Sequence, residues 1–258
     1  MKRHPRWLLR TISVASLAIF VAAWEGASHL KGVTTFLLPP PRLIFEELLD
    51  EFRSGDLSLN IRLTLGRMLA GYSIAVVVGV PLGIALARSR WMRWALDPLL
   101  SVALPMPQVA FLPIFILWLG VGDSSKITLI TASTIFPIIV QTWAGARDVD
   151  KFMIWSAASL GVSKREFIPD ILIPAALPQI FTGLQIALPI ALITTIVAEM
   201  FMGGIGLGGS IINGMRMSES PQLFAGIVVV GAIGFLLDQI LTWLRRSALI
   251  WHPETERR

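Results

Sequence analysis

Cysteine is absent from this chain of 258 residues, and charged residues make up only 15% of it. The absence of cysteine excludes disulfides, zinc–thiolate sites and cysteine nucleophiles. Soluble domains carry about 25% charged residues, so a chain with this few charges cannot cover its surface in water. Because 54% of the residues are hydrophobic, the composition predicts an all-α polytopic membrane protein.

Patterns for catalysis and nucleotide binding are also missing. The three histidines, His4, His29 and His252, lie at the ends of apolar segments, so we predict neither a metal site nor a serine–histidine pair. The segment most similar to a Walker A motif, Gly203–Ser210, lacks the lysine that a P-loop places on phosphate. We therefore expect a chain that is not an enzyme and binds no cofactor, and we expect Gly203–Gly214 to form an outer turn.

Six apolar runs are long enough to cross a bilayer, which takes roughly 20 residues. They cover about residues 7–30, 63–87, 96–119, 127–146, 180–202 and 223–244. A cleaved signal peptide is the alternative for the first run, because its start is basic and small residues follow Phe20. Pro105, Pro107 and Pro113 are expected to kink the third run.

Lysines and arginines predict the orientation of these runs. With the N-terminus inside, 15 of the 22 basic residues fall in cytoplasmic segments and 7 lie outside or at span starts. This bias follows the positive-inside rule, so the basic residues are assigned to topology rather than to nucleic acid. Residues 1–258 then form one transmembrane domain with both termini in the cytoplasm, a periplasmic amphipathic segment at 31–60 and a cytoplasmic loop at 147–179.

The loop at 147–179 carries residues that favour a compact, rigid projection. Ala157 is small, so a partner surface can approach its backbone, and Gly161 can break a helix or take a positive φ. Ser163 is followed three residues later by Glu166, which fits a capping box. The prolines at 169, 174 and 178 are expected to limit helix continuation and to angle the chain back toward the bilayer.

This loop resembles the EAA loop of ABC importer permeases, which is Glu-Ala-Ala, three residues, Gly, nine residues and Ile-x-Leu-Pro. Gly161 sets the register, so Trp155, Ser156 and Ala157 stand at the Glu-Ala-Ala positions. Leu172–Pro174 stands where the Ile-x-Leu-Pro is expected. The resemblance implies that this loop couples the chain to an ATPase, with Trp155 docking by packing in place of the usual glutamate.

Other segments resemble the permease branch that serves sulfonates, taurine, nitrate and related compounds, across about residues 35–252. They are Leu38–Pro41, Gly79–Gly83, Asp97–Leu100, Gly120–Lys126 and Ala198–Glu199. The resemblance implies a type I ABC importer permease fold, with six-span subunits paired as a homodimer in the inner (plasma) membrane of a prokaryote. Two copies of a separate ATPase would bind ATP and Mg inside, and a substrate-binding protein would dock outside.

The expected function is the ATP-driven import of a small organic anion, such as an alkanesulfonate or taurine, or of nitrate. A permease of the same family for a pyrimidine, an aromatic or another small solute is the alternative. An ion-coupled secondary transporter would need charged residues in mid-span, and only Glu199 comes close to that position.

Two sets of residues are candidates for the site. The resemblance places the ATPase contact at Trp155, Ser156, Ala157, Ala158, Leu160, Gly161, Lys164 and Pro174. The translocation path or gate is assigned to Gln108, Gln141, Thr194, Thr195 and Glu199. Helix–helix hydrogen bonding is the alternative for the uncharged members of the second set. For Glu199 the alternatives are a gate residue and an ion pair that locks helices together, because a charge at the centre of a bilayer costs roughly 2.5–3.5 kcal/mol.

Overall fold

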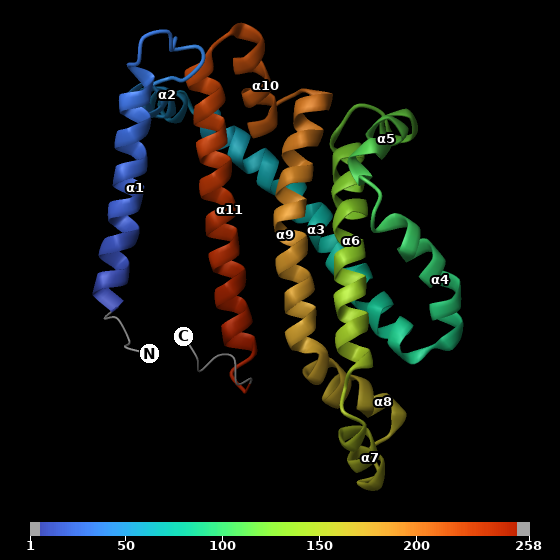
Figure 1. Ribbon diagram of the computed structural model, residues 1–258. Helices are drawn as coiled ribbons and strands as arrows, with labels where there is room; N and C mark the ends of the chain where they lie inside the picture. The colour runs from blue at the N-terminus through green and yellow to red at the C-terminus, as the bar shows by residue number, and fades with distance from the viewer. Residues whose placement is uncertain (1–5, 252–258) are drawn as a thin grey trace.

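The computed structural model describes residues 6–251, except for the side chains of residues 6–11, 13, 14, 17, 164 and 165. Helices are the only regular secondary structure in this part of the chain. Figure 1 shows long helices side by side, with short helices at both ends of the bundle. We name these ends by the short helices that mark them, the α10 end and the α7 end.

Four described helices are long and apolar enough to cross a membrane. They are α3 (Asp56–Arg88), α6 (Asp123–Arg147), α9 (Ile173–Met202, with the preceding turn from Ile168) and α11 (Ser220–Ala248). The predicted runs at 63–87, 127–146, 180–202 and 223–244 are therefore confirmed as helices. Each helix extends beyond its apolar run, because helical hydrogen bonding continues through flanking polar residues after the hydrophobic stretch ends.

The third predicted run is broken rather than kinked. It consists of α4 (Arg90–Ala103), the 3₁₀ turn η1 (Gln108–Phe111) and α5 (Leu112–Leu119), with a bend of 94° between α4 and the rest. The break lies at Pro105 and Pro107, because proline removes a helix hydrogen bond and clashes with the preceding turn. Counted as one span, this pair brings the described spans to five.

The expectation that Pro174 and Pro178 limit helix continuation before the fifth run is wrong. Helix α9 begins at Ile173 and passes through Pro178 and Pro189 without interruption. Pro174 lies near the start of α9, directly after the helical turn from Ile168, so its missing N–H leaves one carbonyl of that turn without its helical donor. Proline further inside is tolerated in membrane helices, since neighbouring groups satisfy the freed carbonyl.

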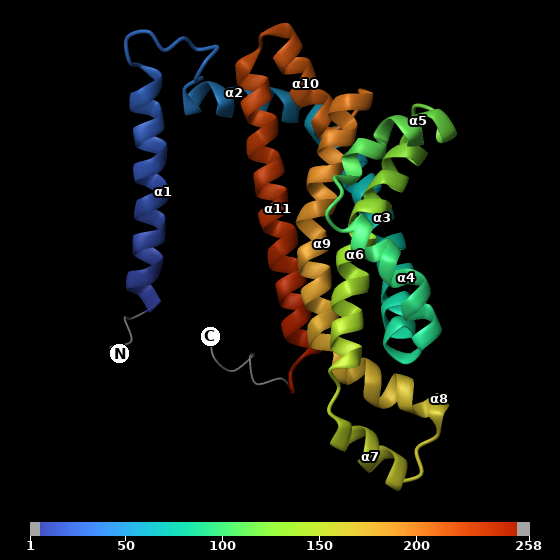
Figure 2. The same cartoon turned by 45° about the vertical axis from the view of Figure 1, so that its right-hand side comes forward.

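The N-terminal helices lie along one side of the bundle. The first predicted run coincides with α1 (Arg6–Ser28), which contacts the bundle through the Trp24 ring, 5.8 Å from that of Phe224. The amphipathic segment forms α2 (Pro41–Ser54), which buries Ile44. Figure 2 shows α2 crossing the α10 end of the long helices. The predicted amphipathic helix is thus confirmed.

Glycines bring α3, α6 and α9 close together in the centre of the fold. A β-carbon at Gly83 of α3 would lie 2.6 Å from the β-carbon of Thr142 on α6. A β-carbon at Gly145 of α6 would lie 2.6 Å from that of Gln179 on α9. Such contacts let helix backbones approach closely where no hydrophobic effect drives association in lipid. This three-helix core connects the two ends of the molecule.

Candidate functional sites

The predicted loop forms two short helices that project beyond the α7 end of the long helices (Figures 1 and 2). Helix α7 (Lys151–Ser159) begins at Asp150, whose carboxylate accepts a hydrogen bond from the backbone N–H of Phe152 at 2.8 Å. A single turn, α8 (Lys164–Phe167), follows, and a π-helical turn, η2 (Ile168–Leu172), leads directly into α9. The loop is therefore joined to α9 by continuous helical backbone.

The turn between α7 and α8 has the geometry that its residues predict. Gly161 has a φ of +79°, a conformation that glycine adopts at no steric cost. The Glu166 N–H donates to Ser163 Oγ at 3.3 Å, and the Ser163 N–H donates to Glu166 Oε2 at 3.0 Å. The capping box is confirmed, and the hydrogen bonds from the Ser163 hydroxyl and backbone lower the pKa of the Glu166 carboxyl.

Ala157 faces the interior of the loop. It is 5% exposed and packs in one cluster with Phe167 and Leu172. We expected a partner protein to approach Ala157, but the side chain is already covered by this chain. The small side chain lets α7 pack against the rest of its own loop. Ser156, Ala158 and Gly161 are exposed, Pro174 is half-buried, and the side chain of Lys164 lies outside the described residues.

Large apolar side chains are exposed on α7 and just after it. Phe152, Trp155 and Leu160 have 72%, 61% and 83% of their surface exposed, and Met153 is also exposed. The Phe152 and Trp155 rings lie edge to face, with centroids 5.5 Å apart. We call these four residues the α7 ridge. An exposed apolar patch of this kind marks an interaction surface.

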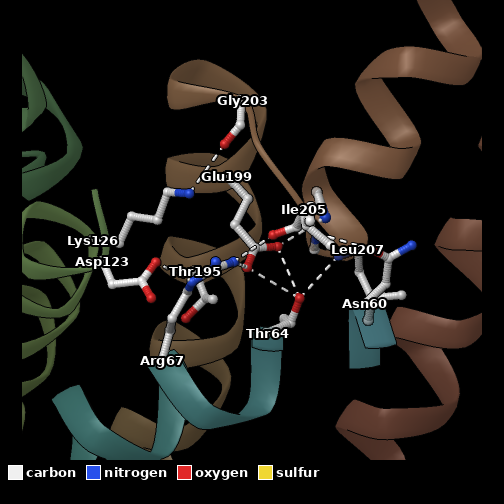
Figure 3. A network of polar contacts seen from close by, with 12 residues as sticks. Asn60, Thr64, Arg67, Asp123, Lys126, Thr195, Glu199, Gly203, Ile205 and Leu207 are labelled. Carbon is white, nitrogen blue, oxygen red and sulfur yellow. Dashed lines mark hydrogen bonds and ion pairs between the residues drawn. The ribbon is translucent and has the colours of Figure 1, made fainter. Parts of the chain in front are cut away.

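A network of buried charges lies near the α10 end (Figure 3). The Glu199 carboxylate on α9 is fully buried. It accepts hydrogen bonds from Arg67 Nη1 of α3 at 2.6 Å and from Thr64 Oγ1 at 2.9 Å. Arg67 Nε also donates to Asp123 Oδ1, at the start of α6, at 2.7 Å. One guanidinium thus joins all three central helices, which is the helix-locking interpretation of Glu199.

The same network holds the glycine-rich turn between α9 and α10 (Leu207–Met217). Arg67 Nη1 donates to the Ile205 carbonyl at 2.7 Å, and Lys126 Nζ donates to the Gly203 carbonyl at 3.0 Å. A β-carbon at Gly206 would lie 2.5 Å from the Glu199 carboxylate. The run expected as an outer turn is therefore a turn over its first residues and helix α10 beyond them.

Arg67 and Lys126 were not singled out as site residues from the sequence, although both are buried in the structure. Their position inside or at the edge of apolar runs was the available signal, since ionisable groups at membrane depth are costly and usually paired. The partner of Arg67 stands 132 positions away in the chain, so spacing alone could not identify it.

The uncharged path candidates lie in several places. Gln108 donates its amide to the Ala103 carbonyl across the break before η1, at 2.8 Å. Gln141 is half-buried at the contact of α6 with α9. Thr194 and Thr195 are buried on α9, and Thr195 Oγ1 donates to the carbonyl one turn earlier at 2.7 Å. The two hydrogen bonds are local to one helix or to the break before η1, so both a role in a path and bonding between helices stay predictions.

An open cavity of about 610 Å³ lies at the α10 end. Its lining residues include Glu47, Asp50, Glu51 and Asp56. Burial, and then repulsion by Glu51 and its acidic neighbours, raises the pKa of the Glu47 carboxyl. The lining of this cavity is therefore strongly acidic.

Comparisons with known proteins agree with this geometry. The taurine transport system permease protein TauC of Escherichia coli (strain K12) is 33% identical over 259 residues, covering 97% of this chain and 94% of that protein. The nitrate import permease protein NrtB of Synechocystis sp. is 32% identical over 238 residues, covering 89% and 86%. The predicted branch of permeases is thereby confirmed.

The fold is also that of a solved transporter. The MetNI methionine ABC transporter in inward-facing conformations matches with a TM-score of 0.64 at 15% identity, over 75% of this chain and 96% of that chain. Residues 79–249 match the family described as "binding-protein-dependent transport system inner membrane component". This chain therefore belongs to the family of inner membrane components of binding-protein-dependent ABC transport systems.

Proposed function

We propose that the chain is the permease subunit of an ATP-driven importer that crosses the membrane six times. Helix α1, the broken pair α4–α5 and the four long helices would supply the spans. The bias of basic residues puts both termini and the α7 end in the cytoplasm, and the α10 end in the periplasm. Two copies would form a homodimer around the path, as the family resemblance implies.

The α7 ridge is the surface at which we place the ATPase. An apolar ridge outside the lipid region needs a partner, and Phe152, Trp155 and Leu160 offer it a large contact area. Aromatic residues contribute strongly to binding when they are desolvated at the centre of an interface. Trp155 would then replace the charge contact of a glutamate by packing, and η2 would pass the motion on to α9.

The cargo is proposed to be a small anion of the sulfonate or nitrate class. Two relatives that cover most of the chain carry taurine and nitrate in their names. The acidic cavity at the α10 end, with Glu47 and Glu51, would repel such an anion. We therefore assign this cavity to docking of a substrate-binding protein, which would carry the selectivity and release the anion into the path.

The buried pair of Arg67 and Glu199, with the exposed Asp123 as a second partner of Arg67, is proposed as the outer latch of the path. Its members come from α3, α9 and α6, so separating these helices requires the guanidinium to exchange its partners. Buried ion pairs lose much free energy when one partner is removed. The latch would favour the state in which the periplasmic side is closed.

The test is uptake of labelled taurine or nitrate into proteoliposomes that hold the permease and its ATPase. Uptake should require ATP inside, where the ATPase lies, and a substrate-binding protein outside. Uptake driven by an ion gradient without ATP would show a secondary transporter and overturn the proposal.

The observation that carries the coupling role is the exposed ridge. Its test uses two variants in the loop and one control variant at a tryptophan of α11. Trp155→Ala and Gly161→Pro should weaken assembly with the ATPase and lower uptake. Trp243→Ala removes a tryptophan of similar exposure, 65%, from α11, and should change neither. Normal assembly and uptake in both loop variants would refute the role of the loop.

A further inference from the structure

Two guanidinium groups lie against one indole at the α7 end of the bundle. Trp143 lies near the C-terminal end of α6, and its ring centroid is 5.9 Å from Cζ of Arg93 and 5.8 Å from Cζ of Arg147. Arg93 belongs to the first turn of α4, so the three side chains join two helices. Arginine above a tryptophan face is a favourable cation–π arrangement, and here it concentrates two positive charges at one place.

The hydrogen-bond donors of this group are not used up by the protein. Arg93 Nε and Trp143 Nε1 are both buried and have no hydrogen-bond partner among the described side chains and backbone. Among the described side chains no carboxylate pairs with Arg93, although Asp97 stands four residues later on the same helix. Buried donors without acceptors are unfavourable, and the positive charge of Arg93 is not neutralised by any carboxylate of the described residues.

Arg147 is also available to a ligand. Its one ion pair in the described residues is to the adjacent Asp148 at 3.9 Å, and both side chains are mostly exposed. An exposed pair at this distance contributes little. The guanidinium can therefore turn toward an anion beside Trp143 at small cost.

The surroundings place this group at the level of lipid headgroups. Trp91 and Trp94, on the same turn of α4 as Arg93, are 81% and 74% exposed, and their rings lie edge to face 6.2 Å apart. Exposed tryptophans of this kind gather at the interface between membrane and water. Further along α4, Leu99 and Val102 are 61% and 62% exposed, which continues the surface into the apolar layer.

We propose that Arg93, Arg147 and Trp143 form a binding site for the phosphate headgroup of an anionic phospholipid. The phosphodiester oxygens would accept hydrogen bonds from the terminal nitrogens of the two guanidinium groups, which the Trp143 ring holds at one place. The acyl chains would lie along the exposed apolar side chains of α4. Basic groups between helices on the cytoplasmic side are known to suit such headgroups. The bound lipid would hold α4 against α6.

The experiment is native mass spectrometry of the permease–ATPase complex, released from detergent with phosphatidylglycerol or phosphatidylcholine present. The wild type should retain phosphatidylglycerol in clear preference to phosphatidylcholine. The double variant Arg93→Gln/Arg147→Gln should bind phosphatidylglycerol at least roughly tenfold more weakly, since each basic residue near the surface contributes about 1 kcal/mol. Trp143→Leu removes the ring that holds the two guanidinium groups at one place, and should weaken retention to a smaller extent.

The matched control is Arg90→Gln, which removes the same charge three residues from Arg93 at an exposed position without a ring contact. It should retain phosphatidylglycerol like the wild type. Equal retention of the two lipids by the wild type would overturn the proposal, as would an equal loss in Arg90→Gln. Displacement of the lipid by millimolar inorganic phosphate would overturn the lipid as the source of the phosphate group. If the double variant does not assemble, Trp143→Leu with unchanged lipid retention would overturn it.

Discussion

Replacing Arg67 by methionine is predicted to destabilise the protein more than replacing Glu199 by glutamine. Without the guanidinium, the Glu199 carboxylate stays fully buried. It keeps hydrogen bonds only from the Thr64 hydroxyl and the Gly208 N–H, at 2.9 and 3.0 Å. An uncompensated buried charge of this kind costs about 3–5 kcal/mol.

The converse variant, Glu199→Gln, leaves no buried charge without a partner. In Glu199→Gln the guanidinium of Arg67 keeps the Asp123 carboxylate at 2.7 Å and the Ile205 carbonyl at 2.7 Å. The loss is then that of one charged hydrogen bond, about 1.5–3 kcal/mol. The double variant Arg67→Met/Glu199→Leu has no charge to bury and should cost less than Arg67→Met alone.

The assay is reversible unfolding in mixed micelles of detergent and dodecyl sulfate, read as the free energy of unfolding for each variant. Asp123→Asn is the control, because the Asp123 side chain is 58% exposed and its pair should contribute about 1 kcal/mol or less. The reasoning fails if Glu199→Gln costs as much as Arg67→Met. It also fails if the double variant costs the sum of the two single changes.

Three further predictions concern packing and titration. Gly83→Ala places a β-carbon 2.6 Å from that of Thr142 on α6. It should lower the free energy of unfolding by about 1–3 kcal/mol and so lower the thermal midpoint. Gly66→Ala meets nothing within 4 Å and should leave the midpoint unchanged. Burial and acidic neighbours raise the pKa of Glu47. The folded state therefore loses stability as pH rises from the ordinary pKa of a glutamate through the raised pKa of Glu47. Glu47→Gln should therefore raise the thermal midpoint at neutral pH and leave it unchanged below the ordinary pKa. Ser163→Ala should cost about 1 kcal/mol of local stability and return the lowered pKa of the Glu166 carboxyl toward 4.5 in an NMR titration. The stabilisation from this cap should be present above pH 4.5 and lost as pH falls through the lowered pKa.

Local chemistry in the sequence predicted local structure well. The positive φ of Gly161 and the capping box of Ser163 and Glu166 depend on residues within a few positions of one another. The long helices follow from hydrophobic runs, because a membrane leaves the backbone few other choices. Pro105 and Pro107 indicated where the third run is interrupted, because proline removes a helix hydrogen bond.

Contacts between distant segments were beyond this reasoning. The pairing of Arg67 with Glu199 and the burial of Ala157 depend on how helices pack after they form. Periodicity does not encode which helices become neighbours. The expectation that Pro174 and Pro178 limit the helix was wrong, because a membrane helix tolerates proline when neighbouring groups satisfy the freed carbonyl.

The central claim is that the α7 ridge contacts a separate ATPase, and the absence of cysteine allows a direct measurement. Ser156→Cys, on exposed α7, carries a benzophenone maleimide in the assembled complex, and Ser58→Cys, exposed near the α10 end, serves as the control. After illumination, the account predicts a covalent adduct of permease and ATPase from position 156 and none from position 58. An adduct from position 58, or an intact complex without an adduct from position 156, would contradict it.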